Sequence, residues 1–113
     1  MKKILLVDAH TDSERLTCSL VDAYQRGAIE NGHSVSMIRI RDLEFEPNLK
    51  FGYEQRIDLE PDLLSAIDAI KTCDHMVWFH PVWWGGLPAL IKGFIDRTFL
   101  PGIMFNYKDR KST

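Results

Sequence analysis

The hydrophobic positions of this chain fall into short unbroken runs and longer stretches with a helical repeat. The first run, Ile4 to Val7, contains no polar residue, which is typical of a strand covered on both faces in the centre of a parallel sheet. Between Glu14 and Asn31 apolar residues recur at helical spacing, and Gly32 follows as a helix-ending residue. The pattern therefore predicts a buried strand followed by a long helix.

The second strand has a different pattern, because polar residues alternate with apolar ones. Residues 34–40 show this partial alternation and include Arg39, as expected of an edge strand with one exposed side. The segment that follows carries Pro, Gly and Phe without a clear period, so we expect a connection in which Phe45 and Phe51 pack locally. This strand should therefore lie at the rim of the sheet.

Two helical repeats flank a third β-rich run in the second half of the chain. Pro61 begins the first of them, at a position where its missing N–H costs nothing. Residues 75–80 indicate a third buried strand, and residues 87–98 repeat again at helical spacing. Charged residues of this last helix are expected on the side opposite its apolar face: Lys92, Asp96 and Arg97.

The alternation of strands and helices is typical of a doubly wound α/β domain with right-handed crossovers. A central first strand, a second at one edge and a third on its other side give the order 2-1-3, which begins the three-layer α/β/α flavodoxin-like arrangement. We expect one such domain over residues 1–113. Ligands of this arrangement bind beyond the carboxyl ends of strands 1 and 3, so the loops at 9–17 and 81–86 form the candidate site.

Composition narrows the classes of partner. The formal net charge is −2, with 14 basic and 16 acidic residues spread along the chain, which disfavours nucleic acid and anionic membranes as partners. No apolar run approaches the roughly 20 residues of a membrane span, and no segment has the features of a secretion signal. Cys18 and Cys73 lack zinc-ligand spacing, so we expect reduced thiols, no metal site and a cytoplasmic protein.

The first loop joins the end of a buried strand to the start of a helix and is rich in hydroxyl groups. Backbone N–H groups and the positive end of the helix dipole favour a phosphate there, and Thr11, Ser13 and Thr17 can add donors. The alternative is an ordinary helix cap formed by Ser13 or Thr11. Neither GxGxxG nor GxxxxGK(S/T) is present, which excludes a Rossmann dinucleotide fingerprint and a nucleoside triphosphate P-loop.

The second loop, "HPVWWGG", combines a proline that ends the strand with two tryptophans and two glycines. Large flat side chains beside an open backbone suit a planar heteroaromatic ligand. The alternative is that Trp83 and Trp84 anchor the core or a subunit interface. Because both loops share one edge of the sheet, we favour a phosphorylated flat cofactor, of which flavin mononucleotide (FMN) and flavin adenine dinucleotide (FAD) are the simplest candidates.

With these motifs the sequence resembles the flavodoxin-like NAD(P)H quinone oxidoreductases, the DT-diaphorase group and its bacterial relatives. The resemblance runs from "KILLVDAH" through "GHSVSMIRIRDLEFEP" to "MFNY", and it is most specific between Asp74 and Gly102. It implies an enzyme that passes a hydride from NAD(P)H to a bound flavin and then to a quinone in the same pocket, by a ping-pong mechanism. The expected flavin is FMN, with FAD as the alternative.

The resemblance also implies which residues bind each group. The cofactor phosphate would lie on the first loop, at His10, Thr11, Arg15, Leu16 and Thr17. The isoalloxazine would lie along the second loop, at Pro81, Val82, Trp83, Trp84 and Gly85. The family positions that line the substrate pocket, often across a homodimer interface, correspond to Phe105 and Tyr107, for which the alternative is surface aromatics on a loose tail. No residue matches the catalytic Tyr and His that relatives often carry further along, so no catalytic acid or base is assigned.

The chain departs from the family pattern at its end, because family members continue with a fourth strand, a Gly-rich loop and a fifth strand. We therefore expect either a fragment or a truncated form in which self-association covers the bare edge of the third strand. Two other functions stay open. One is an ancillary regulatory flavoprotein subunit of a potassium efflux system, and the other is an inactive truncated remnant that keeps part of a flavin site.

Overall fold

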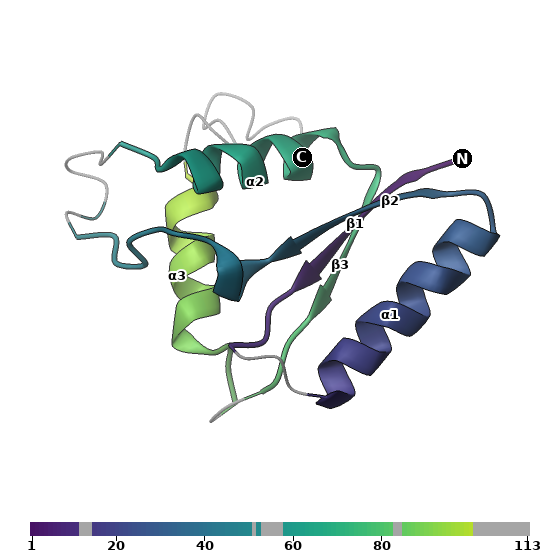
Figure 1. Ribbon diagram of the computed structural model, residues 1–113. Helices are drawn as coiled ribbons and strands as arrows, with labels where there is room; N and C mark the ends of the chain where they lie inside the picture. The colour runs from purple at the N-terminus through teal and green to yellow at the C-terminus, as the bar shows by residue number, and fades with distance from the viewer. Residues whose placement is uncertain (12–14, 51, 53–57, 83–84, 101–113) are drawn as a thin grey trace, which may run out of the picture.

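The computed structural model describes residues 1–11, 15–50, 52, 58–82 and 85–100 of the chain. Figure 1 shows a small sheet with helices on both sides. The predicted strands and helices are all present, and a short 3-10 helix follows the second strand. Their bounds are β1 Lys3–Asp8, α1 Arg15–Glu30, β2 Ser34–Arg39, η1 Ile40–Asp42, α2 Pro61–Thr72, β3 His75–Phe79 and α3 Ala89–Thr98.

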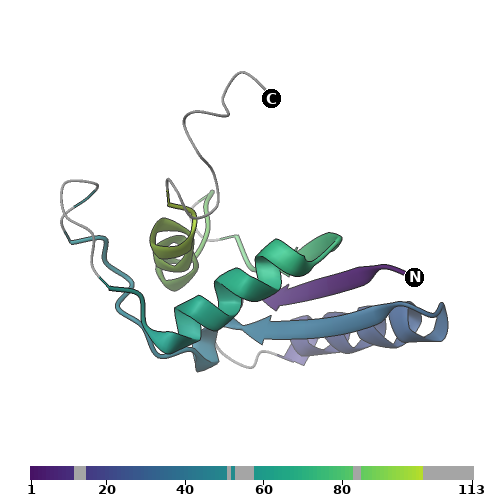
Figure 2. The same ribbon diagram turned by 90° about the horizontal axis from the view of Figure 1, so that it is seen from above.

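The sheet has the predicted order β2-β1-β3, and both pairings are parallel. Leu6 of β1 lies opposite Met37 of β2 and Val77 of β3. Figures 1 and 2 show α1 on one face of the sheet and α2 with α3 on the other, which is the three-layer α/β/α arrangement. Because the strands are parallel, their carboxyl ends all lie at the same edge.

Each face of the sheet packs into its own hydrophobic core. Leu5 and Val7 belong to the core on the α2 and α3 side, together with Leu63 and Phe94. Leu6, which points to the opposite face, joins the core on the α1 side. β1 is therefore covered on both faces, which explains why its apolar run is unbroken.

α1 ends at Glu30, just before the helix-ending glycine that the sequence predicts. Gly32 has a φ of +82°, its N–H donates to the carbonyl of Ile29, and the N–H of His33 donates to the carbonyl of Ala28. These two hydrogen bonds satisfy carbonyls that the end of a helix would otherwise leave open. Glycine adopts this φ without strain, so the chain can turn directly into β2.

α3 begins later than the hydrophobic repeat predicts. The predicted start was Leu87, but the first helical residue is Ala89, and Pro88 is the N-cap with a ψ of 149°. Leu87 precedes a proline, and the proline ring disfavours helical backbone at the residue before it. These two residues therefore belong to the end of the second loop.

β3 is half-buried, so the prediction of a buried strand was wrong. His75 is exposed, and residues 76–79 are only partly covered. Phe79 makes an edge-to-face contact with Tyr24 of α1, with ring centroids 6.0 Å apart. Within the part of the chain that the structure describes, β3 pairs with β1 alone, which leaves its other edge without a strand.

One charged residue of α3 does not follow the predicted pattern. Arg97, expected on the exposed side of the helix, is 1% exposed. Its guanidinium donates to Glu60 Oε1 at 2.8 Å, to the carbonyl of Glu46 at 2.5 Å and to the carbonyl of Asp58 at 3.3 Å. A buried charge requires such partners. Through them Arg97 fastens the connection between β2 and α2 to α3.

The same connection is held by a carboxylate and by an aromatic contact. Burial raises the pKa of Glu60, but the N–H of Glu46 and the guanidinium of Arg97 lower it more in sum, so the pKa lies below its ordinary value. Phe45 packs against Phe94 of α3, with ring centroids 6.1 Å apart, rather than within the connection. Phe51 lies outside the described residues.

Candidate cofactor site at the carboxyl ends of β1 and β3

The two candidate loops begin side by side. The N–H of Ala9, the first residue after β1, donates to the carbonyl of Phe79, the last residue of β3, at 2.7 Å. Figure 1 shows both loops leaving the same end of the sheet, where α1 also begins. The prediction that the loops share one edge of the sheet is therefore confirmed.

The first loop leads from β1 to the first turn of α1. His10 is 8% exposed and Thr11 is half-buried. On the first turn of the helix, Leu16 is 65% exposed and Thr17 is half-buried. Arg15 begins α1, and its side chain lies outside the described part of the chain. Of the predicted phosphate residues, Arg15, Leu16 and Thr17 thus lie in the first turn of α1, where the helix dipole favours an anion.

A buried ion pair lies at the base of the first loop, and sequence reasoning missed it. Asp8 is 1% exposed at the end of β1, and its Oδ1 lies 2.8 Å from Nη1 of Arg41. The same oxygen accepts the N–H of His10 at 3.3 Å. A charged residue at the end of an otherwise apolar strand was the available signal, because a buried carboxylate requires a partner.

The second loop follows β3, and its first described residues include apolar side chains that are partly exposed. Pro81 is half-buried and Val82 is 67% exposed. Gly85 has a φ of +73°, which favours glycine, and among the described residues other than its chain neighbours no atom lies within 4 Å of the position that a Cβ would take. Trp83 and Trp84 lie outside the described residues, so their contact with a ligand stays a prediction.

The predicted substrate residues, Phe105 and Tyr107, also lie outside the described residues. His80, at the start of the second loop, is exposed, and its Nδ1 lies 2.8 Å from the carbonyl of Pro81. Over the described ranges, no group of three or more His, Cys, Asp or Glu side chains could hold a metal ion.

The described groups fit a flavin nucleotide. The start of α1 offers a dipole and the hydroxyls of Thr11 and Thr17 to a phosphate, and Gly85 leaves the second loop open to a flat ring. Apart from its ion pair with Asp8, the buried Nη1 of Arg41 has no hydrogen-bond acceptor among the described residues. A buried donor of this kind is rare and suits a phosphate oxygen.

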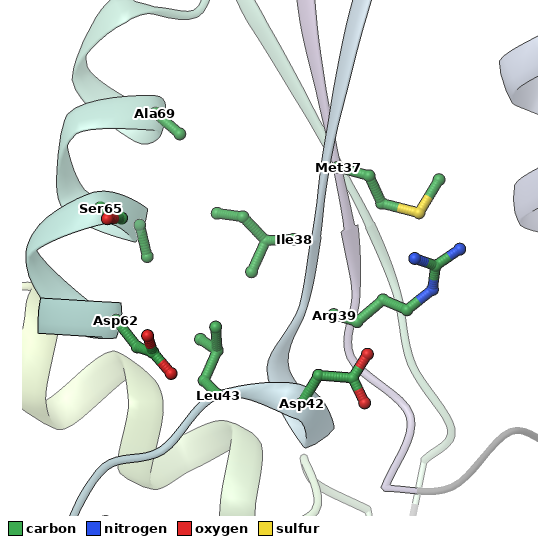
Figure 3. Close-up of a pocket in the computed structure, with 9 residues that line it drawn as sticks. Met37, Ile38, Arg39, Asp42, Leu43, Asp62, Ser65 and Ala69 are labelled. Carbon is green, nitrogen blue, oxygen red and sulfur yellow. The ribbon is translucent and has the colours of Figure 1, made fainter.

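A separate cavity of about 370 Å³ lies between β2 and α2. Figure 3 shows Ile38 pointing toward α2, whereas Met37 and Arg39 point to the opposite face of the sheet. Asp62, which also lines the cavity, accepts the N–H of Glu44 at 2.7 Å and so helps to hold the connection after β2. The described residues that line this cavity include none of the predicted cofactor residues.

Comparison with known proteins connects this site to a family. The model of a family described as "Flavodoxin-like fold" matches residues 2–113. The chain spans about half the length of the curated relatives it matches, with 55% and 53% of two of them covered. The match therefore includes both loops of the candidate site.

Two of these relatives are oxidoreductases by name. An uncharacterized NAD(P)H oxidoreductase of Haemophilus influenzae is 26% identical over 112 residues, which cover 96% of this chain and 55% of the relative. The FMN-dependent NADH:quinone oxidoreductase of Alcanivorax borkumensis is 31% identical over 106 residues, which cover 81% of this chain and 53% of the relative.

Among solved structures, the NAD(P)H:quinone oxidoreductase from Methanothermobacter marburgensis has the same fold. It superimposes with a TM-score of 0.80 at 22% identity, and the match covers 96% of this chain and 58% of that one. The order of the strands and the position of the two loops are thus those of a known architecture.

Proposed function

The chain belongs to the flavodoxin-like fold family, and from this premise we propose that it forms the flavin-binding part of an FMN-dependent NAD(P)H:quinone oxidoreductase. The observation that carries the proposal is the 2.7 Å hydrogen bond from Ala9 to Phe79, which joins the starts of the two loops. One ligand at this edge of the sheet can contact both loops. The name of the relative from Alcanivorax borkumensis supports the same cofactor and acceptor.

In this proposal the first loop binds the cofactor phosphate. The residues that surround it are His10, Thr11, Arg15, Leu16 and Thr17. Hydroxyl groups, backbone N–H groups and the dipole of α1 all favour a dianion at this point. FMN is proposed rather than FAD because these residues suggest a phosphate site without an adenine pocket.

The second loop orients the flavin ring. The residues that line it are Pro81, Val82, Trp83, Trp84 and Gly85. When bound, the flavin supplies two-electron chemistry, since it can accept a hydride from NAD(P)H and then reduce a quinone in ping-pong order. The chain's own residues bind the ring through flat side chains and bring the backbone of Gly85 close to its polar edge.

The active form is a homodimer in this proposal. One edge of β3 carries no strand among the described residues, and on α1 Leu20 is 52% exposed and Tyr24 is 38% exposed. A second copy would cover these surfaces and bring Phe105 and Tyr107 to the substrate pocket. We expect analytical ultracentrifugation to show a dimer. A stable, well-folded monomer would exclude this assembly.

No helix in the described ranges is long and apolar enough to cross a membrane. Cys18 and Cys73 are free thiols, as the sequence predicted. Reduced thiols are typical of proteins in reducing compartments. We therefore propose that the protein works in the cytoplasm.

Purification with added flavin tests the proposed function. We expect a yellow protein with the absorbance of bound FMN, which oxidises NADPH when menadione is added. Yellow protein without NADPH oxidation would favour a flavin-binding regulatory subunit. Colourless protein that neither FMN nor FAD reconstitutes would refute the flavin site.

A further inference from the structure

The ion pair between Asp8 and Arg41 lies outside the loops that carry the predicted cofactor residues. We propose that Arg41 is a further cationic residue of the phosphate subsite, beside the predicted Arg15, and that Asp8 holds Arg41 and offsets its charge. The pair then sets how strongly the site prefers FMN to riboflavin, which has the same ring but no phosphate. This inference rests on the proposed flavin site and adds two residues to it.

The fold brings this pair to the phosphate side of the sheet. Alternation along β1 puts Asp8 on the face that α1 covers, as it does Ile4 and Leu6. The backbone of Asp8 lies opposite Arg39 at the end of β2, and Arg41 follows in η1. The ion pair therefore lies at the carboxyl end of the sheet, where the first loop begins.

The guanidinium of Arg41 lies next to the backbone of the first loop. Asp8 Oδ1 is 2.8 Å from Nη1 of Arg41 and also accepts the N–H of His10 at 3.3 Å. The guanidinium of Arg41 and the N–H of His10 thus both lie close to one oxygen of Asp8. The Arg41 side chain is 14% exposed, and that of Asp8 is 2% exposed, so water screens this contact weakly.

One donor of the pair is left without an acceptor. The contact of Arg41 Nη1 with Asp8 is an ion pair that lacks hydrogen-bond geometry, and within the described part of the chain this buried atom has no other acceptor. Buried donors are nearly always satisfied in folded proteins. At the base of an anion-binding loop, a phosphate oxygen is the acceptor whose charge and chemistry suit a guanidinium.

The charges of the two residues act in opposite directions. The carboxylate of Asp8 alone would repel a phosphate dianion, and the guanidinium of Arg41 alone would attract it. Together the two residues give the phosphate a hydrogen-bond donor held in one direction, and they add no net charge to the site. Removing the charge of Arg41 should therefore weaken FMN binding, and removing the charge of Asp8 should strengthen it.

Flavin titrations of single and double variants test this assignment. The readout is the ratio of the riboflavin Kd to the FMN Kd, measured by fluorescence quenching. Arg41→Gln should lower this ratio on the order of tenfold, and Asp8→Asn should raise it about threefold, because a buried charge acts through a low dielectric. The double variant should lie near the wild-type ratio. Lys92→Gln, which removes a positive charge from an exposed pair on α3, is the matched control and should leave the ratio unchanged.

The outcomes separate this inference from the proposed function. If Arg41→Gln and Asp8→Asn weaken both flavins by equal factors, the pair is only structural and the inference is overturned. If circular dichroism shows that Arg41→Gln does not fold, Asp8→Asn still decides, because a structural role does not predict a rise in the ratio. Wild-type protein that binds neither flavin would overturn the proposed function itself, whereas flavin binding with unchanged ratios would overturn this inference alone.

Discussion

The two faces of the sheet are covered to different degrees. On the α2 and α3 face, Leu63 and Phe94 are fully buried, and Arg97 ties the connection after β2 to α3. On the α1 face, Val21 is buried but Leu20, its neighbour on the same helix, is 52% exposed. Among the described residues, the core on the first face contains more buried residues than the core on the second.

This difference separates the part of the molecule that stabilises the fold from the part that is open to partners. The apolar residues of α1 keep a helical repeat, yet the repeat extends onto an exposed side. Such a surface is typical of a site that another chain or further structure covers. Truncating a buried side chain on the α2 and α3 face should therefore cost stability, and truncating an exposed apolar side chain of α1 should cost much less.

Truncating one large apolar side chain on each face gives the largest contrast. Phe94→Ala should lower the free energy of unfolding by about 3–5 kcal/mol, because Phe94 is fully buried and contacts the rings of Phe45 and Trp78. Leu20→Ala should lower it by about 0.5 kcal/mol. Urea denaturation measures both. Equal losses would show that the two faces are covered alike.

Removal of a buried charge should have the next largest effect. Arg97→Met leaves the carboxylate of Glu60 and the carbonyl of Glu46 without their donor, and should cost about 3 kcal/mol. The matched control on the same helix is Lys92→Met, whose exposed pair with Asp96 should contribute less than about 0.5 kcal/mol. Thermal unfolding of the two variants compares them, and a similar shift in Tm would contradict the role given to Arg97.

A glycine-to-alanine substitution should lower the free energy of unfolding on one face of the sheet and raise it on the other. At Gly93 of α3 a Cβ would lie 2.6 Å from Pro47 Cβ and 2.7 Å from its carbonyl oxygen, so Gly93→Ala should cost about 2 kcal/mol. At Gly27 of α1 no described atom outside the helix's own neighbouring backbone lies within 4 Å of a Cβ, so Gly27→Ala should stabilise the fold by about 0.5–1 kcal/mol. Urea midpoints that move in the same direction would contradict this difference in packing.

The smallest effect should be a dependence on pH. The pKa of Glu60 is lower in the folded state than its ordinary value, so the charged form stabilises the fold above the unfolded-state pKa of about 4.3. That stabilisation is lost as pH falls through the folded-state pKa. The stability difference between the wild type and Glu60→Gln should therefore shrink between neutral pH and acid, as denaturation at several pH values would show. A constant difference would exclude this contribution.

The sequence predicted the elements and their order because both depend on local pattern. The unbroken run of β1, the partial alternation of β2 and the position of Gly32 each have a direct physical cause in the chain. The order of the strands followed from the same patterns together with the handedness of crossovers. The carboxyl-end position of the two loops then came from the topology alone.

The parts that sequence reasoning missed depend on distant partners. Arg97 is buried because Glu46 and Glu60, far earlier in the chain, meet it, and Asp8 is buried because Arg41 reaches it. A lone charged residue in a pattern usually lies on the surface, so neither pair was expected. The burial of β3 depends in the same way on what lies beyond its edge. The helix cap proposed at Ser13 lies outside the described residues.

The central claim is that the carboxyl ends of β1 and β3 form a flavin site, and FMN titration of two glycine variants tests it most directly. Gly85 and Gly32 both have a positive φ, and in the described part of the chain no atom outside their chain neighbours lies within 4 Å of a Cβ position, but Gly32 lies at the end of α1. Alanine should strain both backbones similarly. We expect Gly85→Ala to raise the FMN Kd at least about fivefold and Gly32→Ala to leave it within about twofold. Equal changes, or no change at Gly85, would contradict the claim.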